Sequence, residues 1–366
     1  MSNKAKVLVA MSGGVDSSVT ALLLKRAGYD CIGATMRLYD SIRIDCKQPT
    51  CCSLEDTEDA RAVASALDMP FHVLDYRDSF DEQVIRRFVD EYRQGRTPNP
   101  CIFCNRFLKF ERLLQEAQKL GCDFVATGHY ARVECDEAGV HHLRCGVDES
   151  KDQSYVLYML GQEELSHVLL PLGGLTKARV REIAQENGLV NAKKGESQDI
   201  CFVPDGDYAA FLAREGVESA PGDILDSSGN VLGQHDGIIH YTIGQRKGLG
   251  VALGKPAYVT AIDAAANTVT IGPLEELEVP AFRVEGVVWT AGNAPAAPYE
   301  VTVRTHYHAK RVPALVSAEG PKSALVRVST PLRAVAPGQA AVFYVGDEVV
   351  GGGTIASRCS ANPQAI

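Results

Sequence analysis

The chain has 366 residues, of which 45% are hydrophobic and 23% are charged, an ordinary globular composition that is long enough for two or three domains. Its formal net charge of −9 argues against a protein that coats nucleic acid non-specifically, because such binding needs a basic field, although a local basic groove remains compatible with it. No run approaches the ~20 apolar residues of a membrane span and the N-terminal apolar run is too short for a signal peptide, so we expect a cytoplasmic protein with no membrane partner.

Up to about residue 130 the chain alternates short β-branched runs with segments of helical periodicity. This alternation predicts a parallel sheet with helices on both faces, joined by right-handed crossovers. Ligands of such sheets lie beyond the carboxyl ends of the strands, and Ser12, Met36 and Gly128 fall at or just after such ends. The expected strands span residues 6–11, 31–39, 71–76 and 123–128, and the expected helices follow residue 14 and include residues 60–67, 84–92 and 106–120.

The texture of the sequence changes in the second half of the chain. Residues 152–190 and 205–216 still read as mostly helical, whereas after Pro221 short alternating strands are separated by Asp-Gly, Ser-Gly and Gly-Gly turns. Such a pattern is typical of small β-barrels. We therefore predict fold class α/β, with a parallel-sheet nucleotide-binding domain over residues 1–210 and two small, mostly-β, barrel-like domains over residues 211–279 and 280–366.

The stretch "MSGGVDSS", residues 11–18, joins the first expected strand to the first expected helix. Glycines in such a unit let backbone N–H groups approach phosphate oxygens, and the helix N-terminus adds roughly half a positive charge. Asp16 would be repelled by a phosphate unless a cation lay between them, so we expect Mg²⁺ here. The alternative is an ordinary glycine turn of an α/β domain.

The loop lacks the lysine of the Walker pattern, which is absent from the whole chain. Transfer of the terminal phosphoryl group is therefore disfavoured. The stretch instead resembles the SGGxDS pyrophosphate loop (PP-loop) of the ATP pyrophosphatase superfamily, whose members cleave ATP to AMP and pyrophosphate while they adenylate a substrate oxygen.

The eleven cysteines form neither a short disulfide framework nor paired zinc knuckles, and we expect most of them, including Cys51 and Cys52, to be structural or incidental. Cys101 and Cys104 follow the run "TPNP", which predicts an extended path and places both thiols on a loop just ahead of the helix at 106–120. A helix N-terminus favours the reactive thiolate. The alternatives are a chance CxxC or half of a zinc site, which needs four ligands.

A third cysteine, Cys201, lies in the polar-flanked loop "GESQDICFVPDGDY", with Ser197, Gln198 and Asp199 before it. With this loop, seven motifs stand in order along nearly the whole chain. They are SGGVDSS, TPNPxxxCN, ATGHY, KDQSYxLY, SQDICF, YTIGQRKGLG and PGQAAVFY. Their combination is similar to that of the bacterial tRNA-specific 2-thiouridylases.

This resemblance implies an enzyme, a tRNA-uridine 2-sulfurtransferase, that uses ATP and Mg²⁺ to adenylate the C2 oxygen of a wobble uridine and replaces that oxygen by sulfur, giving 2-thiouridine, AMP and pyrophosphate. Cys201 matches the cysteine that carries sulfur as a persulfide. Cys104 matches its nucleophilic partner, which can close a transient disulfide with Cys201. The matching ATP-binding positions are Ala10, Met11, Ser12, Gly13, Gly14, Val15, Asp16, Ser17, Met36 and Gly128.

The resemblance also implies tRNA as a partner, with the target base flipped out of its stack. The base would be met by Asn99, Pro100 and Cys101. Further contacts with tRNA are implied for His129, Lys151, Asp152, Gln153, His306, Tyr307 and Gln339. The family precedent is glutamate, glutamine and lysine tRNAs, with sulfur supplied by a cysteine desulfurase or a sulfur-carrier protein.

Two positions depart from the family pattern and leave alternatives open. The family often has arginine where this chain has His306, which would carry less charge at neutral pH. It often has an acidic residue where this chain has Cys101. Three thiolates from Cys101, Cys104 and Cys201 could instead hold a [4Fe–4S] cluster with one open iron.

Two further functions also use part of the pattern. A ligase or amidotransferase synthetase of the same superfamily would share the PP-loop without needing reactive cysteines. A non-catalytic RNA-binding module could hold a structural metal at Cys101, Cys104 and nearby thiols.

Overall fold

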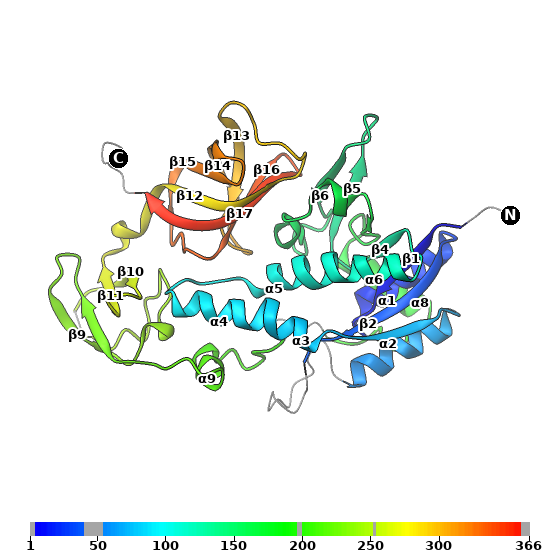
Figure 1. The fold of residues 1–366 in the computed structure, drawn as a ribbon, viewed down its shortest axis with the longest axis horizontal. Coiled ribbons are helices and arrows are strands. Elements are labelled where there is room, and N and C mark those ends of the chain that lie inside the picture. Colours follow the sequence, from blue (N-terminus) through cyan, green and yellow to red (C-terminus); the bar gives the residue numbers. More distant parts are fainter. Residues whose placement is uncertain (1–3, 40–53, 196–199, 252–253, 360–366) are drawn as a thin grey trace.

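A five-stranded parallel sheet forms the N-terminal part of the molecule, in the strand order β3-β2-β1-β4-β7 (Figure 1). The computed structural model describes residues 4–39, 54–195, 200–251 and 254–359; Cys51, Cys52 and the predicted motif residues Ser197, Gln198 and Asp199 lie outside these ranges. The strands are β1 (Lys6–Ala10), β2 (Asp30–Arg37), β3 (Phe71–Asp75), β4 (Phe124–Ala126) and β7 (Val168–Leu169).

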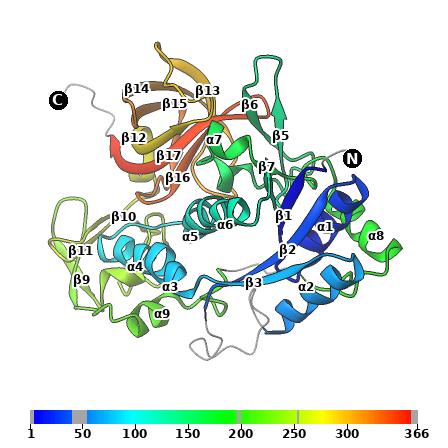
Figure 2. The same cartoon turned by 45° about the vertical axis from the view of Figure 1, so that its right-hand side comes forward.

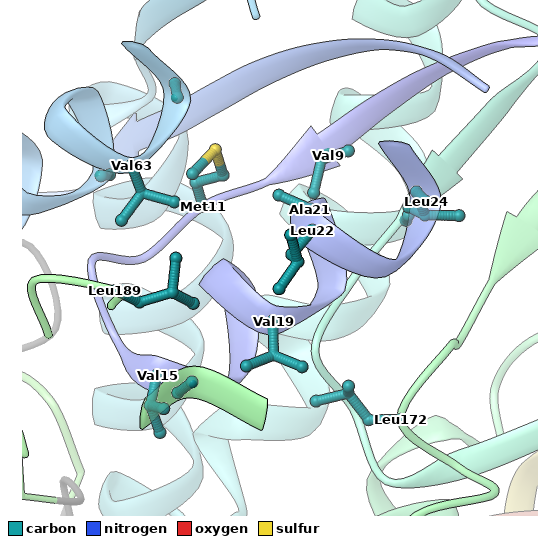
Figure 3. Close-up of a cluster of buried hydrophobic side chains, with 14 of the residues drawn as sticks. Val9, Met11, Val15, Val19, Ala21, Leu22, Leu24, Val63, Leu172 and Leu189 are labelled. Carbon is teal, nitrogen blue, oxygen red and sulfur yellow. The ribbon is translucent and has the colours of Figure 1, made fainter. Parts of the chain in front are cut away.

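Both faces of this sheet are buried, as the alternation of side chains along β1 shows. Val7 and Val9 face a core that includes residues of helices α1 (Val15–Arg26), α2 (Leu54–Ala66) and α8 (Lys177–Glu186), part of which is drawn in Figure 3. Leu8, between them, faces a second core with Leu113 and Ala117 of α6 (Leu113–Lys119). The predicted parallel sheet with helices on both faces is confirmed.

Two runs of consecutive helical segments follow β3; the first leads away from the parallel sheet and the second returns to it (Figures 1 and 2). The first comprises α3 (Arg77–Phe80), the π-helix η1 (Asp81–Ile85) and α4 (Arg86–Arg93), and the second comprises α5 (Pro100–Phe103), the π-helix η2 (Cys104–Arg112) and α6. The predicted loop around Cys101 and Cys104 is therefore wrong, because the helix begins at Pro100. Proline is favourable in the first turn, and the Asn99 side chain caps it by accepting a hydrogen bond from the Cys101 N–H.

The segment at 152–190 is less helical than its sequence suggests. Apart from α8, it holds only the 3₁₀ turn η3 (Ser154–Leu157) and the short helix α7 (Gln162–Leu165). Every side chain from Ser154 to Leu160 is buried, so tertiary packing on all sides, rather than an amphipathic face, determines its path.

A hairpin from the N-terminal part of the chain belongs to the sheet of the C-terminal barrel, not to the parallel sheet. Strands β12 to β17 close through the pairing of β12 with β17, and the hairpin β5–β6 of the N-terminal part continues the same sheet by pairing β6 with β17 (Figure 2). The hairpin consists of β5 (Ala131–Cys135) and β6 (His141–Cys145). The barrel strands are β12 (Glu278–Trp289), β13 (Tyr299–Arg304), β14 (Val312–Gly320), β15 (Ser323–Arg333), β16 (Ala340–Val345) and β17 (Glu348–Cys359).

A four-stranded sheet, in the order β10-β11-β8-β9, lies between the two larger parts in the chain and at the end of α4 that is distant from the parallel sheet (Figures 1 and 2). It follows helix α9 (Tyr208–Arg214). Its strands are β8 (Gly222–Leu225), β9 (Val231–His235), β10 (Tyr258–Asp263) and β11 (Thr268–Gly272). The predicted fold class, an α/β domain followed by two small mostly-β parts, is confirmed. In the described ranges, no helix has the length and apolar character to cross a membrane.

Candidate functional site

The loop between β1 and α1 is held by neighbouring backbone. The Met11 N–H donates to the Ala34 carbonyl at 2.8 Å, and the Thr35 hydroxyl donates to the Met11 carbonyl at 2.5 Å. Gly13 has a φ of +76°, and a Cβ at this position would lie 2.2 Å from the carbonyl oxygen of Asp56. Only glycine fits there, since the conformation and the close approach both exclude a side chain.

Hydroxyl and amide groups line the same turn. Ser17 Oγ accepts a hydrogen bond from the Ser12 N–H at 3.2 Å and donates to the Gly14 carbonyl at 3.0 Å. Gly128, which follows β4, packs against the first turn of α1, where a Cβ would lie 3.1 Å from both Asp16 Cβ and Ser17 N. The fold therefore brings Gly128 to the loop, and it leaves backbone and hydroxyl donors together at a helix N-terminus, which suits a phosphate.

The cation beside Asp16 is supplied by the chain itself. Lys177 Nζ, in the first turn of α8, lies 2.7 Å from each carboxylate oxygen of Asp16, and the Tyr130 hydroxyl donates to Asp16 Oδ1 at 2.7 Å. The Lys177 side chain is only 10% exposed. Reasoning from the sequence missed this residue; the only signal was the basic run "TKARVR", which has no fixed spacing from the loop.

A second lysine lies close to the loop. Lys194 forms ion pairs with Asp56 at 2.7 Å and Asp59 at 2.5 Å. Burial alone lowers the pKa of Lys194, but hydrogen bonds to Asp56 and Asp59 outweigh it and raise the pKa overall, so this side chain is positively charged near neutral pH. The carbonyl oxygen of Asp56 approaches Gly13 closely. Asp56 therefore contacts both the loop, through its carbonyl, and Lys194, through its carboxylate.

Cys104 and Cys201 are brought to one apolar cluster although they lie in distant segments. Both side chains are partly buried and pack against the cluster that contains Phe80, Phe88 and Phe202, as does Met36. The Tyr39 hydroxyl donates to the Cys201 carbonyl at 3.1 Å. Cys101, by contrast, is exposed in the first turn of α5.

Part of the barrel reaches the loop before Cys101. The Thr97 N–H donates to the Pro337 carbonyl at 2.9 Å, and the Gln339 side-chain amide donates to the Thr97 carbonyl at 2.8 Å. Burial, the charge of Asp152 and the nearby Cys101 thiol raise the pKa of Tyr307, whose ring lies 6.0 Å from that of Tyr155. The structure thus brings Tyr307 and Gln339 to the segment that contains Asn99, Pro100 and Cys101.

His306 is exposed next to Tyr307. Partial burial, followed by the charges of His308 and Arg304, lowers the pKa of His306. Its ring is therefore mostly neutral at pH 7, and it differs in charge from an arginine at that position.

Two of the predicted RNA contacts are buried inside the protein. The Asp152 carboxylate accepts hydrogen bonds from the Gly146 and Ser154 N–H groups at 3.1 Å and forms ion pairs with the barrel residues Arg304 at 3.5 Å and Arg311 at 3.8 Å. The side chain of Asp152 is 3% exposed. It therefore connects the parallel-sheet domain to the barrel.

His129 is also buried, with its Nδ1 at 2.7 Å from the Thr127 hydroxyl and its ring 5.8 Å from that of Phe110. Burial, and secondarily Lys109, lowers the pKa of His129 well below its usual value, so the ring is neutral. Lys151 and Gln153, the flanking positions of Asp152, are partly exposed, and Gln153 Oε1 accepts a hydrogen bond from the Tyr130 N–H at 3.0 Å.

Among the residues that the structure describes, no group of three or more His, Cys, Asp or Glu side chains converges in the way that metal ligands do. Cys101, Cys104 and Cys201 therefore do not form a preassembled three-thiolate site.

Three family models match successive parts of the chain. A tRNA methyl transferase HUP domain model covers residues 5–205, a tRNA methyl transferase PRC-barrel domain model covers residues 209–273, and an aminomethyltransferase beta-barrel domain model covers residues 279–355.

Full-length relatives carry a single description. The chain is 50% identical over 359 residues to the tRNA-specific 2-thiouridylase MnmA of Carboxydothermus hydrogenoformans, covering 97% of this chain and 98% of that protein. It is 49% identical over 362 residues to the protein of the same name from Geobacter metallireducens, with the same coverage. Among solved structures, a 4-thiouridine synthetase in complex with RNA and ATP aligns at 20% identity with a TM-score of 0.38, over 58% of this chain and 50% of that chain.

Proposed function

This chain belongs to the family of tRNA-specific 2-thiouridylases, and from that premise we propose that it adenylates the C2 oxygen of a wobble uridine and then replaces the oxygen by sulfur carried on Cys201. Its activity is the ATP-dependent 2-thiolation of tRNA. The observation that best supports the finer mechanism is the packing of Cys104, Cys201 and Met36 against one cluster next to the carboxyl end of the parallel sheet. We propose the cytoplasm as its compartment because its substrate is tRNA.

ATP would bind at the loop from Ala10 to Ser17, with Met36 and Gly128 beside the adenosine. The turn fits a pyrophosphate, since Gly13 leaves room for backbone donors and the Ser12 and Ser17 groups already hydrogen-bond within the loop. Lys177 would provide the positive charge that the loop itself lacks. Mg²⁺ would enter with the nucleotide, with phosphate oxygens and water as most of its ligands, and Asp16 would join them by giving up one of its contacts with Lys177.

The adenylation step joins the uridine C2 oxygen to the α-phosphorus of ATP and releases pyrophosphate, so that AMP becomes the leaving group. The terminal sulfur of the Cys201 persulfide then bonds to C2, and the C2–O bond breaks with release of AMP. The Cys104 thiolate attacks Cys201 Sγ, which forms a Cys104–Cys201 disulfide and leaves sulfur on C2. A dithiol reductant then reduces the Cys104–Cys201 disulfide to two thiols and is itself oxidised to a disulfide.

On the RNA side, Asn99, Pro100 and Cys101 would surround the flipped base, and Lys151, Gln153, His306, Tyr307 and Gln339 would contact neighbouring nucleotides. For the buried Asp152 and His129 we propose supporting roles, in which Asp152 orients Arg304 and Arg311 of the barrel. The tRNA partners would be those for glutamate, glutamine and lysine, with a cysteine desulfurase or a sulfur-carrier protein as the donor.

The direct test is to incubate the protein with tRNA, ATP, Mg²⁺ and a persulfide source, and to digest the tRNA for nucleoside mass spectrometry. We expect 2-thiouridine together with AMP and pyrophosphate in equal amounts. Formation of ADP and orthophosphate would contradict the adenylation step. Absence of 2-thiouridine from the digested tRNA would contradict the function.

A further inference from the structure

A basic, glycine-rich loop of the four-stranded-sheet domain has no role in the reaction proposed above. Its described residues are 242–251 and 254–255, and they include the exposed side chains of Arg246, Lys247 and Lys255. No aspartate or glutamate occurs between Asp236 and Asp263, although the whole chain has a net charge of −9. A local cationic segment in an acidic protein indicates attraction to an anionic partner.

The described part of the loop is held in one conformation by its own contacts. Gln245 braces it, because Gln245 Oε1 accepts a hydrogen bond from the Thr242 N–H at 3.0 Å and Nε2 donates to the Lys247 carbonyl at 3.0 Å. The Leu249 side chain is buried in the core of the four-stranded-sheet domain. The cationic side chains are thus presented from an anchored backbone, which reduces the entropy lost on binding.

Beside this backbone lies a hollow of about 450 Å³. Its lining combines the Arg246 and Lys255 side chains with the backbone of Gly248 and Gly250, whose φ angles of +72° and +74° turn the chain sharply. Arg246, Lys247 and Lys255 form no ion pair with any residue in the described ranges. Unpaired cations around a hollow can take phosphate oxygens without first breaking an internal contact.

The loop is tied to the segment that precedes the cysteines. A Cβ at Gly244 would lie 2.8 Å from Ala334 Cβ, and Ala336 is buried in the same core as Leu249. The segment at 334–339 then contacts Thr97 through the Pro337 carbonyl and the Gln339 amide. One short segment therefore fixes the basic loop relative to the residues proposed to receive the target base.

We propose that Arg246, Lys247 and Lys255 bind backbone phosphates of the tRNA substrate outside the flipped nucleotide. This inference rests on the proposed function, because it takes tRNA as the partner. Phosphate contacts set affinity and register without reading bases, so the loop positions the stem while Asn99 and its neighbours receive the base. The alternative occupant is an acidic surface of the sulfur-donor protein, which the test separates from tRNA.

The test compares the triple variant R246Q/K247Q/K255Q with a charge-matched control, K4Q/R214Q/K322Q, whose three cations are exposed elsewhere on the chain. Binding of fluorescent full-length tRNA is measured from about 50 to 200 mM salt. Each lost phosphate contact lowers the slope of log K against log salt by about 0.7 to 0.9, so we expect a slope lower by about two to three and an affinity at least roughly tenfold weaker at low salt. The control should follow the wild type.

Unchanged affinity and slope in the R246Q/K247Q/K255Q variant would overturn the inference. An equal loss in the control would overturn it too, since net charge alone would then explain the effect. If the R246Q/K247Q/K255Q variant binds tRNA normally but is loaded with persulfide more slowly by the donor protein, the loop binds the donor protein and not tRNA. Binding is measured without turnover, so absence of 2-thiouridine with the wild-type protein would count against the proposed function and not against this loop.

Discussion

The ammonium group of Lys177 donates to both carboxylate oxygens of Asp16, at 2.7 Å each, from a position 161 residues further along the chain. The pair stands at the first turn of α1, where Asp16 follows the glycines of the loop. The loop proposed to bind the nucleotide has no lysine of its own, and α8 delivers one to it. Because the Lys177 side chain is largely shielded from solvent, we expect its charge to act on a phosphate at this loop with little screening.

Replacing Lys177 by methionine should lower the rate of AMP formation by roughly 100-fold, the order of loss seen when one charge-stabilising donor is removed from an active site. Arg179→Met, on the exposed side of the same helix, is the matched control and should keep full activity. Full activity of Lys177→Met would exclude Lys177 from the phosphate site.

Asp16→Ala should abolish turnover and keep the fold, with a loss of about 1 to 3 kcal/mol in the free energy of unfolding because Lys177 loses its partner.

Cys201→Ser should remove both the protein-bound persulfide and 2-thiouridine. Cys104→Ser should still load the persulfide but fail to release sulfur to tRNA, because the attacking thiolate is missing. Intact-protein mass spectrometry measures the first property and nucleoside analysis the second. Cys135→Ser, an exposed cysteine of β5, serves as the control and should behave as wild type. Full thiolation by Cys104→Ser would rule out the two-cysteine relay.

Cys101 separates the relay from a [4Fe–4S] cluster. The relay predicts that anaerobically purified protein is colourless and free of iron and that Cys101→Ser retains thiolation activity. A cluster would require about four irons per chain and loss of activity in this variant. Iron and acid-labile sulfide analysis, with the thiolation assay on the same preparation, distinguishes the two.

Asp152→Asn should weaken the docking of the barrel. The substitution keeps the shape but removes the charge that attracts Arg304 and Arg311, and a hydrogen bond to a charged group, such as that from Arg304, contributes about 1.5 to 3 kcal/mol. The single tryptophan, Trp289, is buried in the barrel, so its fluorescence reports the urea transition of that part of the chain. We expect a lower midpoint than in the control Glu149→Gln, an exposed carboxylate nearby. Equal midpoints would mean that Asp152 does not support the barrel.

His142 makes the same interface sensitive to pH. Its hydrogen bond to Glu348 of β17, and then that to Asp136, raises the pKa of His142. A raised folded-state pKa contributes stability that is fully present below the unfolded value of about 6.5 and is lost as the pH rises through the folded-state value.

We therefore expect the Trp289 urea midpoint of the wild type to exceed that of His142→Gln at about pH 6, and the difference to shrink in alkaline buffer. A difference that grows with pH would contradict the assignment. Arg144, which shares Glu348 with His142, stays charged across this range and should not contribute to the change.

Several elements could be predicted from the sequence because local spacing alone produces them. The parallel sheet follows from apolar runs alternating with helical periodicity, and the turn at Gly13 and Gly14 follows from residues that stand next to one another. The start of α5 at Pro100 was also encoded locally, by Asn99 as a cap and proline in the first turn. The "PNP" run predicts an extended segment, but the Asn99 cap and the proline that follows it begin a helix instead.

Which distant residues meet depends on how the whole chain packs. Lys177 reaches Asp16, Gln339 reaches Thr97, and Asp152 turns inward to the barrel arginines, and none of these pairs has a spacing that periodicity could reveal. The hairpin β5–β6 joins the barrel sheet for the same reason, since strand pairing between distant segments depends on how the whole chain closes. Local elements and the types of reactive residues can be derived from the sequence, because backbone and side-chain preferences act over a few residues; the assembly of those residues depends on long-range packing that no short segment contains.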